Sequence, residues 1–332
     1  MSEKKREEKK SFRLATRSSP LAKIQAESVR KLLLEKGFHA VLKELKTEGD
    51  RVQDKPLSEI GGKGVFIKEL EVALLEGEAD VGIHSLKDLP CRLEDSFELV
   101  AHLPRDFPHD VIVVKKASRL DQLFEVGKNF LRKDDLSSLP ACDVATGSLR
   151  RESLLRNANP LITVLPIRGN IGTRLKKLDE NYAEALILSE ASLLRMAYDE
   201  KKIQFYRLEP SWFVPCAGQG VVVVEALKKT KLDKFFESLS SFETLITTHL
   251  ERGVLEMLGG SCLLPIGVYC RLKAKVYHLD IFIGDKTGEE ILTYEKEFSR
   301  ANSYKEILKM VKKDLYEKDI NKVLRKLGLA EI

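Results

Sequence analysis

The stretch Phe12-Arg13-Leu14-Ala15-Thr16-Arg17-Ser18-Ser19-Pro20-Leu21 has the pattern of a strand that passes through a polar turn into a helix. Phe12 to Thr16 is short and mostly apolar, and Ser19 with Pro20 supplies the N-cap and first position typical of a helix start. Apolar residues then recur at helical spacing until Gly37. A related pattern returns at Ala145-Thr146-Gly147-Ser148, where another strand enters a turn and a helix. This echo predicts two α/β lobes.

Strands and helices alternate over the first two thirds of the chain, which predicts mainly parallel sheets with helices on both faces. We expect strands at 40–45, 79–84, 143–146, 161–166 and 185–188, and helices at 65–76, 171–178 and 191–196. The polar segment 115–140 lacks clear periodicity and is predicted to be a surface excursion of the second lobe. Beyond residue 224 the pattern changes to a long helix, a glycine break, three strand-like runs and a terminal amphipathic helix. That order predicts a smaller α+β domain at the C-terminus.

Composition excludes several classes of protein. The 332 residues carry a net charge of +5, and part of that excess lies in the tail Met1 to Lys10. We expect this charged tail to be disordered, and the nearly balanced remainder argues against a nucleic-acid-binding protein. We expect neither a targeting segment nor a membrane span, because no apolar stretch is long enough. Five cysteines are an odd number, so a disulfide framework is not expected and a reduced cytoplasmic setting is.

Basic residues gather where predicted strands give way to helices. They are Arg17, Arg150, Arg151, Arg168 and Arg174, with Lys63 in Gly61-Gly62-Lys63-Gly64 and Lys87 in His84-Ser85-Leu86-Lys87-Asp88. Surface cations of any protein would be scattered, whereas five arginines at three such junctions predict one anion-binding site. Phosphate and carboxylate ligands both remain open on these grounds. The glycine-rich segment around Lys63 lacks the spacing of a nucleotide-triphosphate-binding loop.

Two further residues have more than one interpretation. On spacing alone, Asp88 is more readily a counter-ion for the nearby cations than a catalytic group. Cys262 lies in the glycine-broken loop 260–265, yet a lone cysteine is more often a small buried apolar residue. Neither cysteine nor histidine occurs at metal-ligand spacing, so no metal site is expected.

Motifs along the whole chain resemble one family, porphobilinogen deaminase, which is also called hydroxymethylbilane synthase. In chain order these motifs are ATRSSPLA at 15–22, GGKGVFIKELE at 61–71, HSLKDLP at 84–90, SLRR at 148–151, RGNIGTRL at 168–175, GQG at 218–220, and Cys262 ahead of PIG at 265–267.

The resemblance implies two lobes similar to periplasmic binding proteins and a third domain that carries a covalent dipyrromethane cofactor on a cysteine. Cys262 matches that cysteine. We therefore expect lobe 1 at 11–105 with 218–239, lobe 2 at 106–217 and the cofactor-carrying domain at 240–332. The implied activity joins four porphobilinogen molecules head to tail, releases ammonia at each step and finally hydrolyses off hydroxymethylbilane.

The resemblance also assigns roles residue by residue. Asp88 matches the catalytic aspartate, which stabilises positive charge on the pyrrole rings. The expected cofactor contacts, besides Cys262, are Lys87, Arg150, Arg151, Ser85, Ser148 and Thr146. The expected substrate contacts are Arg17, Ser19, Arg168, Arg174, Arg195, Lys63 and Gln25. Each porphobilinogen unit brings an acetate and a propionate, which is the reason that the resemblance gives for so many cations.

Departures and alternatives remain beside this interpretation. The chain reads Phe107-Pro108-His109-Asp110 where the family often has Asp-Pro-Arg-Asp. The alternative function is a non-catalytic module that binds a small anion between two lobes, which would have no use for Cys262 or a third domain. We expect a cytoplasmic monomer with porphobilinogen as its small-molecule partner, and neither nucleic acid nor membrane as a partner.

Overall fold

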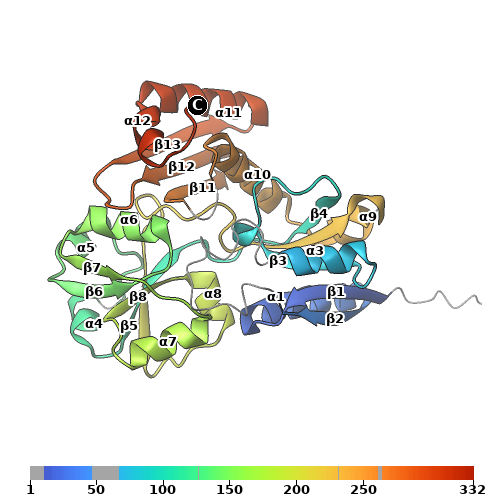
Figure 1. Ribbon diagram of the computed structural model, residues 1–332, viewed down its shortest axis with the longest axis horizontal. Helices are drawn as coiled ribbons and strands as arrows, with labels where there is room; N and C mark the ends of the chain where they lie inside the picture. The colour runs from blue at the N-terminus through green and yellow to red at the C-terminus, as the bar shows by residue number, and fades with distance from the viewer. Residues whose placement is uncertain (1–10, 47–66, 126, 231, 261–263) are drawn as a thin grey trace, which may run out of the picture. The chain divides into compact units, whose positions relative to one another are not determined.

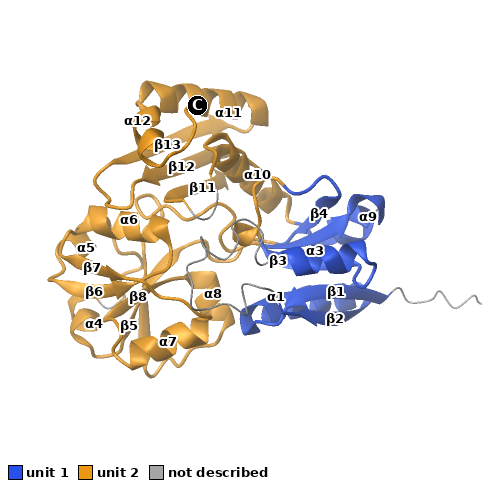
Figure 2. Cartoon of the chain, in the orientation of Figure 1, with its two compact units in different colours: residues 1–85, 93–103, 222–240 blue, residues 86–92, 104–221, 241–332 orange. Residues whose placement is uncertain are grey.

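The computed structural model describes residues 11–46, 67–125, 127–230, 232–260 and 264–332 (Figure 1). The chain divides into two compact units, which Figure 2 colours separately. Unit 1 comprises Met1–Ser85, Leu93–Leu103 and Val222–Ser240, and unit 2 comprises Leu86–Arg92, Pro104–Val221 and Ser241–Ile332. The chain therefore passes from unit 1 to unit 2 directly after Ser85, within the predicted anion-binding motif 84–88.

Unit 1 is built on a five-stranded sheet with the order β2-β1-β3-β10-β4. Its strands are β1 (Ser11–Arg17), β2 (His39–Leu45), β3 (Val81–Ser85), β4 (Phe97–His102) and β10 (Val222–Leu227). Only β10 runs against its neighbours. The helical elements are α1 (Pro20–Glu35), α3 (Lys68–Leu75), α9 (Asp233–Phe236), and the short 3-10 helices Lys228–Thr230 and Glu237–Leu239.

The strand β1 shows why this sheet is covered on both faces. Successive side chains of a strand point to opposite faces, and Leu14 and Ala15 are both fully buried. Leu14 packs with Val29 and Leu33 of α1, whereas Ala15 packs with Leu70 of α3. The predicted strand–turn–helix at the start of the chain is confirmed, with Ser19 as the N-cap of α1.

Unit 2 contains a second five-stranded sheet with the order β7-β6-β8-β5-β9. Its strands are β5 (Asp110–Lys115), β6 (Cys142–Ala145), β7 (Ile162–Leu165), β8 (Ala185–Ser189) and β9 (Ile203–Arg207). Here β5 is the reversed strand, in the place that β10 occupies in unit 1. The helices that follow β6, β7 and β8 are α6 (Leu149–Ala158), α7 (Ile171–Asp179) and α8 (Glu190–Arg195). The common strand order explains the echo between residues 15–18 and 145–148.

The segment 115–140 differs from its prediction. It forms α4 (Arg119–Leu123) and α5 (Lys133–Ser137), and its apolar side chains enter the core of the second sheet. Leu120, Leu131 and Leu136 are almost completely buried. The segment is therefore a structural part of the lobe rather than a surface excursion, because a few widely spaced leucines suffice to attach it.

The C-terminal part of unit 2 is an antiparallel sheet covered by helices, as predicted. It consists of α10 (Phe242–Met257), β11 (Ile266–Lys273), β12 (Val276–Gly284), β13 (Ile291–Ser299), α11 (Tyr304–Glu317) and α12 (Ile320–Lys326). Val254, Ile281, Val311 and Leu324 belong to one buried cluster that joins the sheet to three helices. The division into three domains stays a prediction, because this part and the second five-stranded sheet belong to the same compact unit.

Candidate active site

The turn after β3 carries Lys87 and Asp88. It is a 3-10 helix over Leu86–Asp88, in which Leu86 is buried while the Asp88 side chain is exposed. The Leu86 N–H donates to the Val221 carbonyl over 2.9 Å. The end of β3 and the buried Leu86 therefore fix the position of the turn, and the Asp88 carboxylate faces solvent at the start of unit 2.

Three arginines of unit 2 lie close enough to Asp88 or to one another to interact electrostatically. Burial, together with the positive charges of Arg151 and Arg168, lowers the pKa of Arg174 to about 10, although the Asp88 carboxylate acts in the opposite direction. The Arg174 Nε donates to the Gly169 carbonyl over 2.9 Å. In the part of the chain that the structure describes, the buried Nη1 of Arg168 has no hydrogen-bond partner. This group, Asp88 with Arg151, Arg168 and Arg174, is called the arginine cluster below.

Arg150 and Arg151 are attached to a buried carboxylate. Arg150 Nη2 and Arg151 Nη2 each lie 2.7 Å from an oxygen of Asp110, whose side chain is fully buried. Burial alone would raise the pKa of Asp110, but the two guanidiniums outweigh that effect and lower it to about 2. Arg150 also donates to the Val214 carbonyl and Arg151 to the Ile187 carbonyl. Each guanidinium has five N–H groups, so donors remain on both.

The turn between β6 and α6 supplies uncharged polar groups. Thr146 is buried and its Oγ1 accepts from the Ser148 N–H over 3.2 Å. Ser148 is the N-cap residue of α6, yet its hydroxyl makes no capping hydrogen bond. A Cβ on Gly147 would lie 2.6 Å from the Ile167 carbonyl oxygen, so only glycine fits this close approach. The N-terminus of α6 thus presents a hydroxyl and N–H groups next to Arg151.

The remaining predicted residue of unit 2, Arg195, ends α8. Its Nη2 lies 2.5 Å from Asp106 and 3.3 Å from the Gly220 carbonyl. The ion pair is partly exposed, since the Asp106 side chain is 51% accessible. Arg195 therefore has a carboxylate partner, whereas none of the described residues supplies one to Arg168 or Arg174.

Unit 1 holds four described candidates. The Gln25 side chain is buried, and its Nε2 donates to the Ser85 Oγ over 2.8 Å. Ser19 accepts from the Ala22 N–H, which is the capping bond of α1. Arg17 ends β1 and is partly buried. Two of these four residues, Gln25 and Ser85, are brought into direct contact.

Two predicted residues, Lys63 and Cys262, lie outside the described residues. Gly260, two residues before Cys262, is described and its carbonyl lies 3.9 Å from the Cys91 sulfur.

The arginine cluster has the chemistry expected for a ligand with several carboxylates. Arg168 and Arg174 carry positive charge in a partly buried place, one of their N–H donors has no partner among the described residues, and burial has lowered one of their pKa values. Buried positive charge and an unused N–H donor both cost free energy. A carboxylate ligand would offset both, because it supplies a hydrogen-bond acceptor and a negative charge. The residues therefore fit a ligand that carries several carboxylates.

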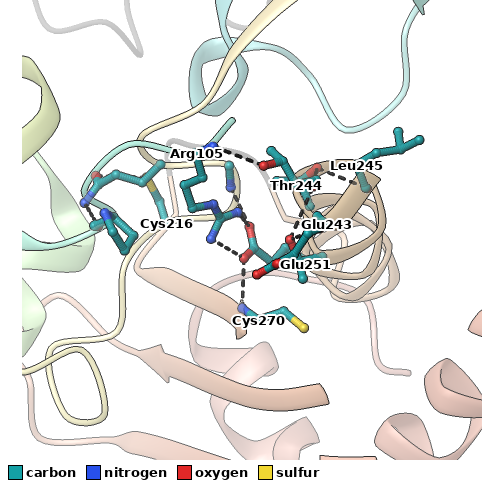
Figure 3. A network of polar contacts seen from close by, with 12 residues as sticks. Arg105, Cys216, Glu243, Thr244, Leu245, Glu251 and Cys270 are labelled. Atoms are coloured by element: carbon teal, nitrogen blue, oxygen red, sulfur yellow. Dashed lines mark hydrogen bonds and ion pairs between the residues drawn. The ribbon is translucent and has the colours of Figure 1, made fainter. Parts of the chain in front are cut away.

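Asp110, Gln219 and Glu251 were missed by sequence reasoning. Asp110 holds both adjacent arginines, and Gln219 Nε2 donates to it over 3.0 Å. The sequence carried no signal for this pairing, because the burial of Arg150 and Arg151, which requires a carboxylate, is a property of the folded chain. Glu251 of α10 is fully buried and binds Arg105 through two contacts of 2.8 Å each (Figure 3). Its two oxygens also accept from the Gly218 and Cys270 N–H groups.

Neither a metal centre nor a membrane helix is found within the described ranges. No group of three or more His, Cys, Asp or Glu residues there is placed to hold a metal ion. None of the helices described is long and apolar enough to cross a bilayer.

Comparison with known proteins identifies the family. Residues 12–234 match the family model described as "Porphobilinogen deaminase, dipyromethane cofactor binding domain". The porphobilinogen deaminase of Caldicellulosiruptor saccharolyticus is 35% identical over 90% of this chain and 99% of its own length. That of Chromobacterium violaceum is 39% identical over 84% of this chain and 86% of its own length. The probable porphobilinogen deaminase of Sulfurisphaera tokodaii is 35% identical over 88% of this chain and 92% of its own length.

Comparison with solved structures finds an ancestral cationic amino acid solute binding protein, with a TM-score of 0.43 and 11% identity over 69% of this chain and 87% of that chain. At that distance it adds nothing to the assignment. The family model and the curated relatives, by contrast, agree over most of the sequence. The chain belongs to the porphobilinogen deaminase family.

Proposed function

We propose that the protein condenses four porphobilinogen molecules head to tail and then releases the linear product hydroxymethylbilane by hydrolysis. In each condensation the bond between the aminomethyl carbon and nitrogen of one molecule breaks, and a carbon–carbon bond forms to a ring carbon of another pyrrole. That ring carbon loses a proton, which together with the departing amine makes ammonia. The last step consumes one water. Membership of the family supports this transferase activity.

The arginine cluster is the observation that carries the proposal for the site. Arg168 and Arg174 both lack a carboxylate partner at ion-pair distance among the described residues, and Arg174 interacts electrostatically with Arg151, Arg168 and Asp88. Substrate carboxylates would complete their hydrogen bonding, and the low local dielectric would strengthen the contact. We assign these arginines to binding and orienting substrate. Arg17, Ser19, Gln25, Lys63 and Arg195 complete the proposed substrate contacts.

Asp88 is proposed as the catalytic carboxylate. It is an exposed acid at the end of a turn whose base is buried, so its position is defined while its oxygens stay accessible. Loss of ammonia and attack by a pyrrole both place positive charge near ring nitrogens, and a fixed carboxylate stabilises that charge. Its oxygens would also accept hydrogen bonds from the pyrrole N–H groups and so orient the reacting carbon.

The proposed cofactor is a dipyrromethane tethered to Cys262, consistent with the description of the family model. When bound, the cofactor supplies the pyrrole ring carbon to which the first substrate is joined. We propose that Lys87, Arg150 and Arg151 bind its carboxylates, and that Ser85, Thr146 and Ser148 contribute hydrogen bonds. The Ser148 hydroxyl makes no capping hydrogen bond, and Arg151 has N–H groups that are not used by Asp110 or Ile187; both observations support these roles.

The wider setting belongs to the same proposal. We infer a cytoplasmic monomer, in which the lobes 11–105 with 218–239 and 106–217 are followed by the cofactor-carrying domain 240–332. Cys142 and Cys270 are free and buried, which supports a reducing compartment.

The decisive experiment combines intact-protein mass with ammonia release. We expect the purified protein to exceed its polypeptide mass by two pyrrole units and to release ammonia when porphobilinogen is added. A peptide digest should place the added mass on Cys262, while Cys262→Ser should remove it. A protein with no added mass that binds porphobilinogen without releasing ammonia would contradict the proposal and leave an anion-binding module.

A further inference from the structure

The segment Leu86–Arg92 has few backbone hydrogen bonds of its own. Among the described residues, these are the bond from the Leu86 N–H to Val221 and that from the Leu89 N–H to Leu86. Pro90 has no N–H to donate, so an attachment of this residue through its backbone can be made only at its carbonyl. This matters because Lys87 and Asp88 lie in the middle of the segment.

Arg252 of α10 supplies that attachment. Its Nη2 donates to the Pro90 carbonyl over 2.6 Å and to the Cys91 carbonyl over 2.9 Å. Two hydrogen bonds from one guanidinium nitrogen fix the two carbonyls next to each other. They hold the chain two and three residues beyond Asp88 to a regular 16-residue helix.

The environment of Arg252 shows that its charge is directed at these carbonyls. The described residues place no carboxylate within ion-pair distance of its guanidinium. Burial lowers the pKa of Arg252, and the effects of Cys91 and Glu256 oppose that shift only in part. A partly buried arginine without a paired carboxylate is costly unless its N–H groups are used. Here they are used on the backbone of the Asp88 segment.

The same helix supports the other side of the segment. Glu251, next to Arg252, accepts from the Gly218 N–H over 2.8 Å. Gly218 in turn packs against Leu86, whose Cγ would lie 2.7 Å from a Cβ at that glycine. Arg252 thus contacts the end of the segment directly, and the adjacent Glu251 supports its beginning through Gly218 (Figure 3 shows the Glu251 contacts).

We propose that Arg252 is a positioning residue for Asp88, which acts by holding the carbonyls of Pro90 and Cys91. This inference rests on the proposed function of Asp88. Arg252 keeps the Lys87–Asp88 turn at one place relative to Arg151, Arg168 and Arg174, which belong to the same unit. Misplacement of a catalytic group by about 1 Å costs on the order of a hundredfold in rate, so a remote anchor of this kind has a large kinetic effect.

The test uses Arg252→Met, which keeps an apolar stem and deletes the donors, and Arg252→Lys, which retains a charged donor. The matched control is Asp314→Leu in α11, which removes two hydrogen bonds of the same unit, from Tyr294 and Lys296. We expect Arg252→Met to speed amide exchange in the peptide covering 86–92 by about tenfold or more. In single-turnover assays it should slow ammonia release by roughly 10- to 100-fold with KM for porphobilinogen within about threefold. Arg252→Lys should recover part of the rate.

A double-mutant cycle separates positioning from general stabilisation. On the Asp88→Asn background, Arg252→Met should cause little further loss of rate, because the group that it positions is already gone. Asp314→Leu should lower the melting temperature without changing ammonia release or exchange at 86–92. The proposal is overturned if exchange at 86–92 is unchanged in Arg252→Met, or if its rate loss adds fully to that of Asp88→Asn. The exchange measurement decides the question even for a variant that lacks cofactor. Failure of the proposed function would be separate, since the unaltered protein would then release no ammonia.

Discussion

The arginines of unit 2 differ in the carboxylates that surround them. Arg150 and Arg151 share Asp110, and their ion pairs are almost fully buried. Arg174 has no such partner among the described residues and its pKa is lowered by burial and by two neighbouring arginines. The first pair therefore contributes to stability, whereas Arg174 is available to a ligand at some cost to the fold.

Arg150→Leu and Arg174→Leu should accordingly have opposite effects. Arg150→Leu leaves the Asp110 charge partly uncompensated and should lower the free energy of unfolding by about 3 kcal/mol. Arg174→Leu should leave stability unchanged or raise it, yet weaken porphobilinogen binding by roughly 10- to 100-fold. Denaturant unfolding and substrate titration measure the two quantities. Equal losses of stability in both variants would contradict the distinction.

Asp88→Asn tests charge stabilisation at the proposed catalytic residue. Asparagine retains the size and one acceptor oxygen of the side chain but removes the negative charge. On protein that already carries cofactor, porphobilinogen should still bind while ammonia release slows on the order of a thousandfold. Single-turnover kinetics with mass analysis of bound species measures this. A rate near that of the unaltered protein would return Asp88 to the role of a counter-ion.

Glu71 of α3 provides a test of pH dependence. Burial, together with the negative charges of Glu225 and Glu94, raises the pKa of Glu71 to about 7, although His84 and Lys68 oppose the shift. Because the folded-state pKa lies above the unfolded value, the protonated form is favoured on folding, and this contribution to stability is lost as pH rises through about 7.

Glu71→Gln should therefore raise the free energy of unfolding by on the order of 1–2 kcal/mol at a pH above the folded pKa. The gain should vanish below the unfolded pKa, where the carboxyl is protonated in both states. Melting curves across this pH range measure the difference. A gain that is constant with pH would show that Glu71 does not titrate in this window.

At the scale of elements, the connection between β3 and unit 2 depends on a glycine. Gly218 has a φ of +74°, and a Cβ there would lie 2.7 Å from the Leu86 Cγ. Both the backbone conformation and the space therefore require glycine. The element that carries Asp88 thus depends on a residue more than a hundred positions later.

Gly218→Ala should lower the free energy of unfolding by about 2–4 kcal/mol, since it combines a left-handed backbone with overpacking. The matched control is Gly37→Ala, where φ is +84° and no atom lies within 4 Å of the added Cβ. That change should cost only about 1 kcal/mol. Chemical denaturation of both variants gives the comparison. Similar losses of unfolding free energy would show that the Leu86 side chain moves aside at little cost.

At the scale of the whole molecule, the cofactor should stabilise the fold by neutralising like charges. We expect Cys262→Ser protein, which lacks the tether, to melt lower than the loaded protein, because Arg151, Arg168 and Arg174 then repel one another. Raising sodium chloride from about 0.05 M to about 0.5 M should narrow the difference, since salt screens repulsion between charges. Arg174→Leu on the Cys262→Ser background should reduce the salt effect. No salt dependence in Cys262→Ser would contradict this account.

Parts of the fold escaped prediction for identifiable reasons. The strands β4, β5 and β9 were not predicted, because no helix that the sequence predicts follows them, and a short apolar run does not by itself distinguish a strand from other buried segments. The segment 115–140 looked external because its buried leucines are too far apart to show a period. By contrast, β1 with α1 was predicted well, because Ser19 and Pro20 mark the helix start locally.

The sequence by itself determined what is encoded locally: the strand–turn–helix units, the cations at their junctions, the C-terminal α+β part and the motifs of the family. The tertiary structure alone decided which cations are compensated and what holds the Asp88 turn. Arg150 meets Asp110 across 40 positions of the chain, and Arg252 meets Pro90 across 162. No local pattern encodes such pairs, because burial and partner are properties of the folded chain. Two arginines in one motif can therefore stabilise the fold while another, with the same charge, is left for a ligand.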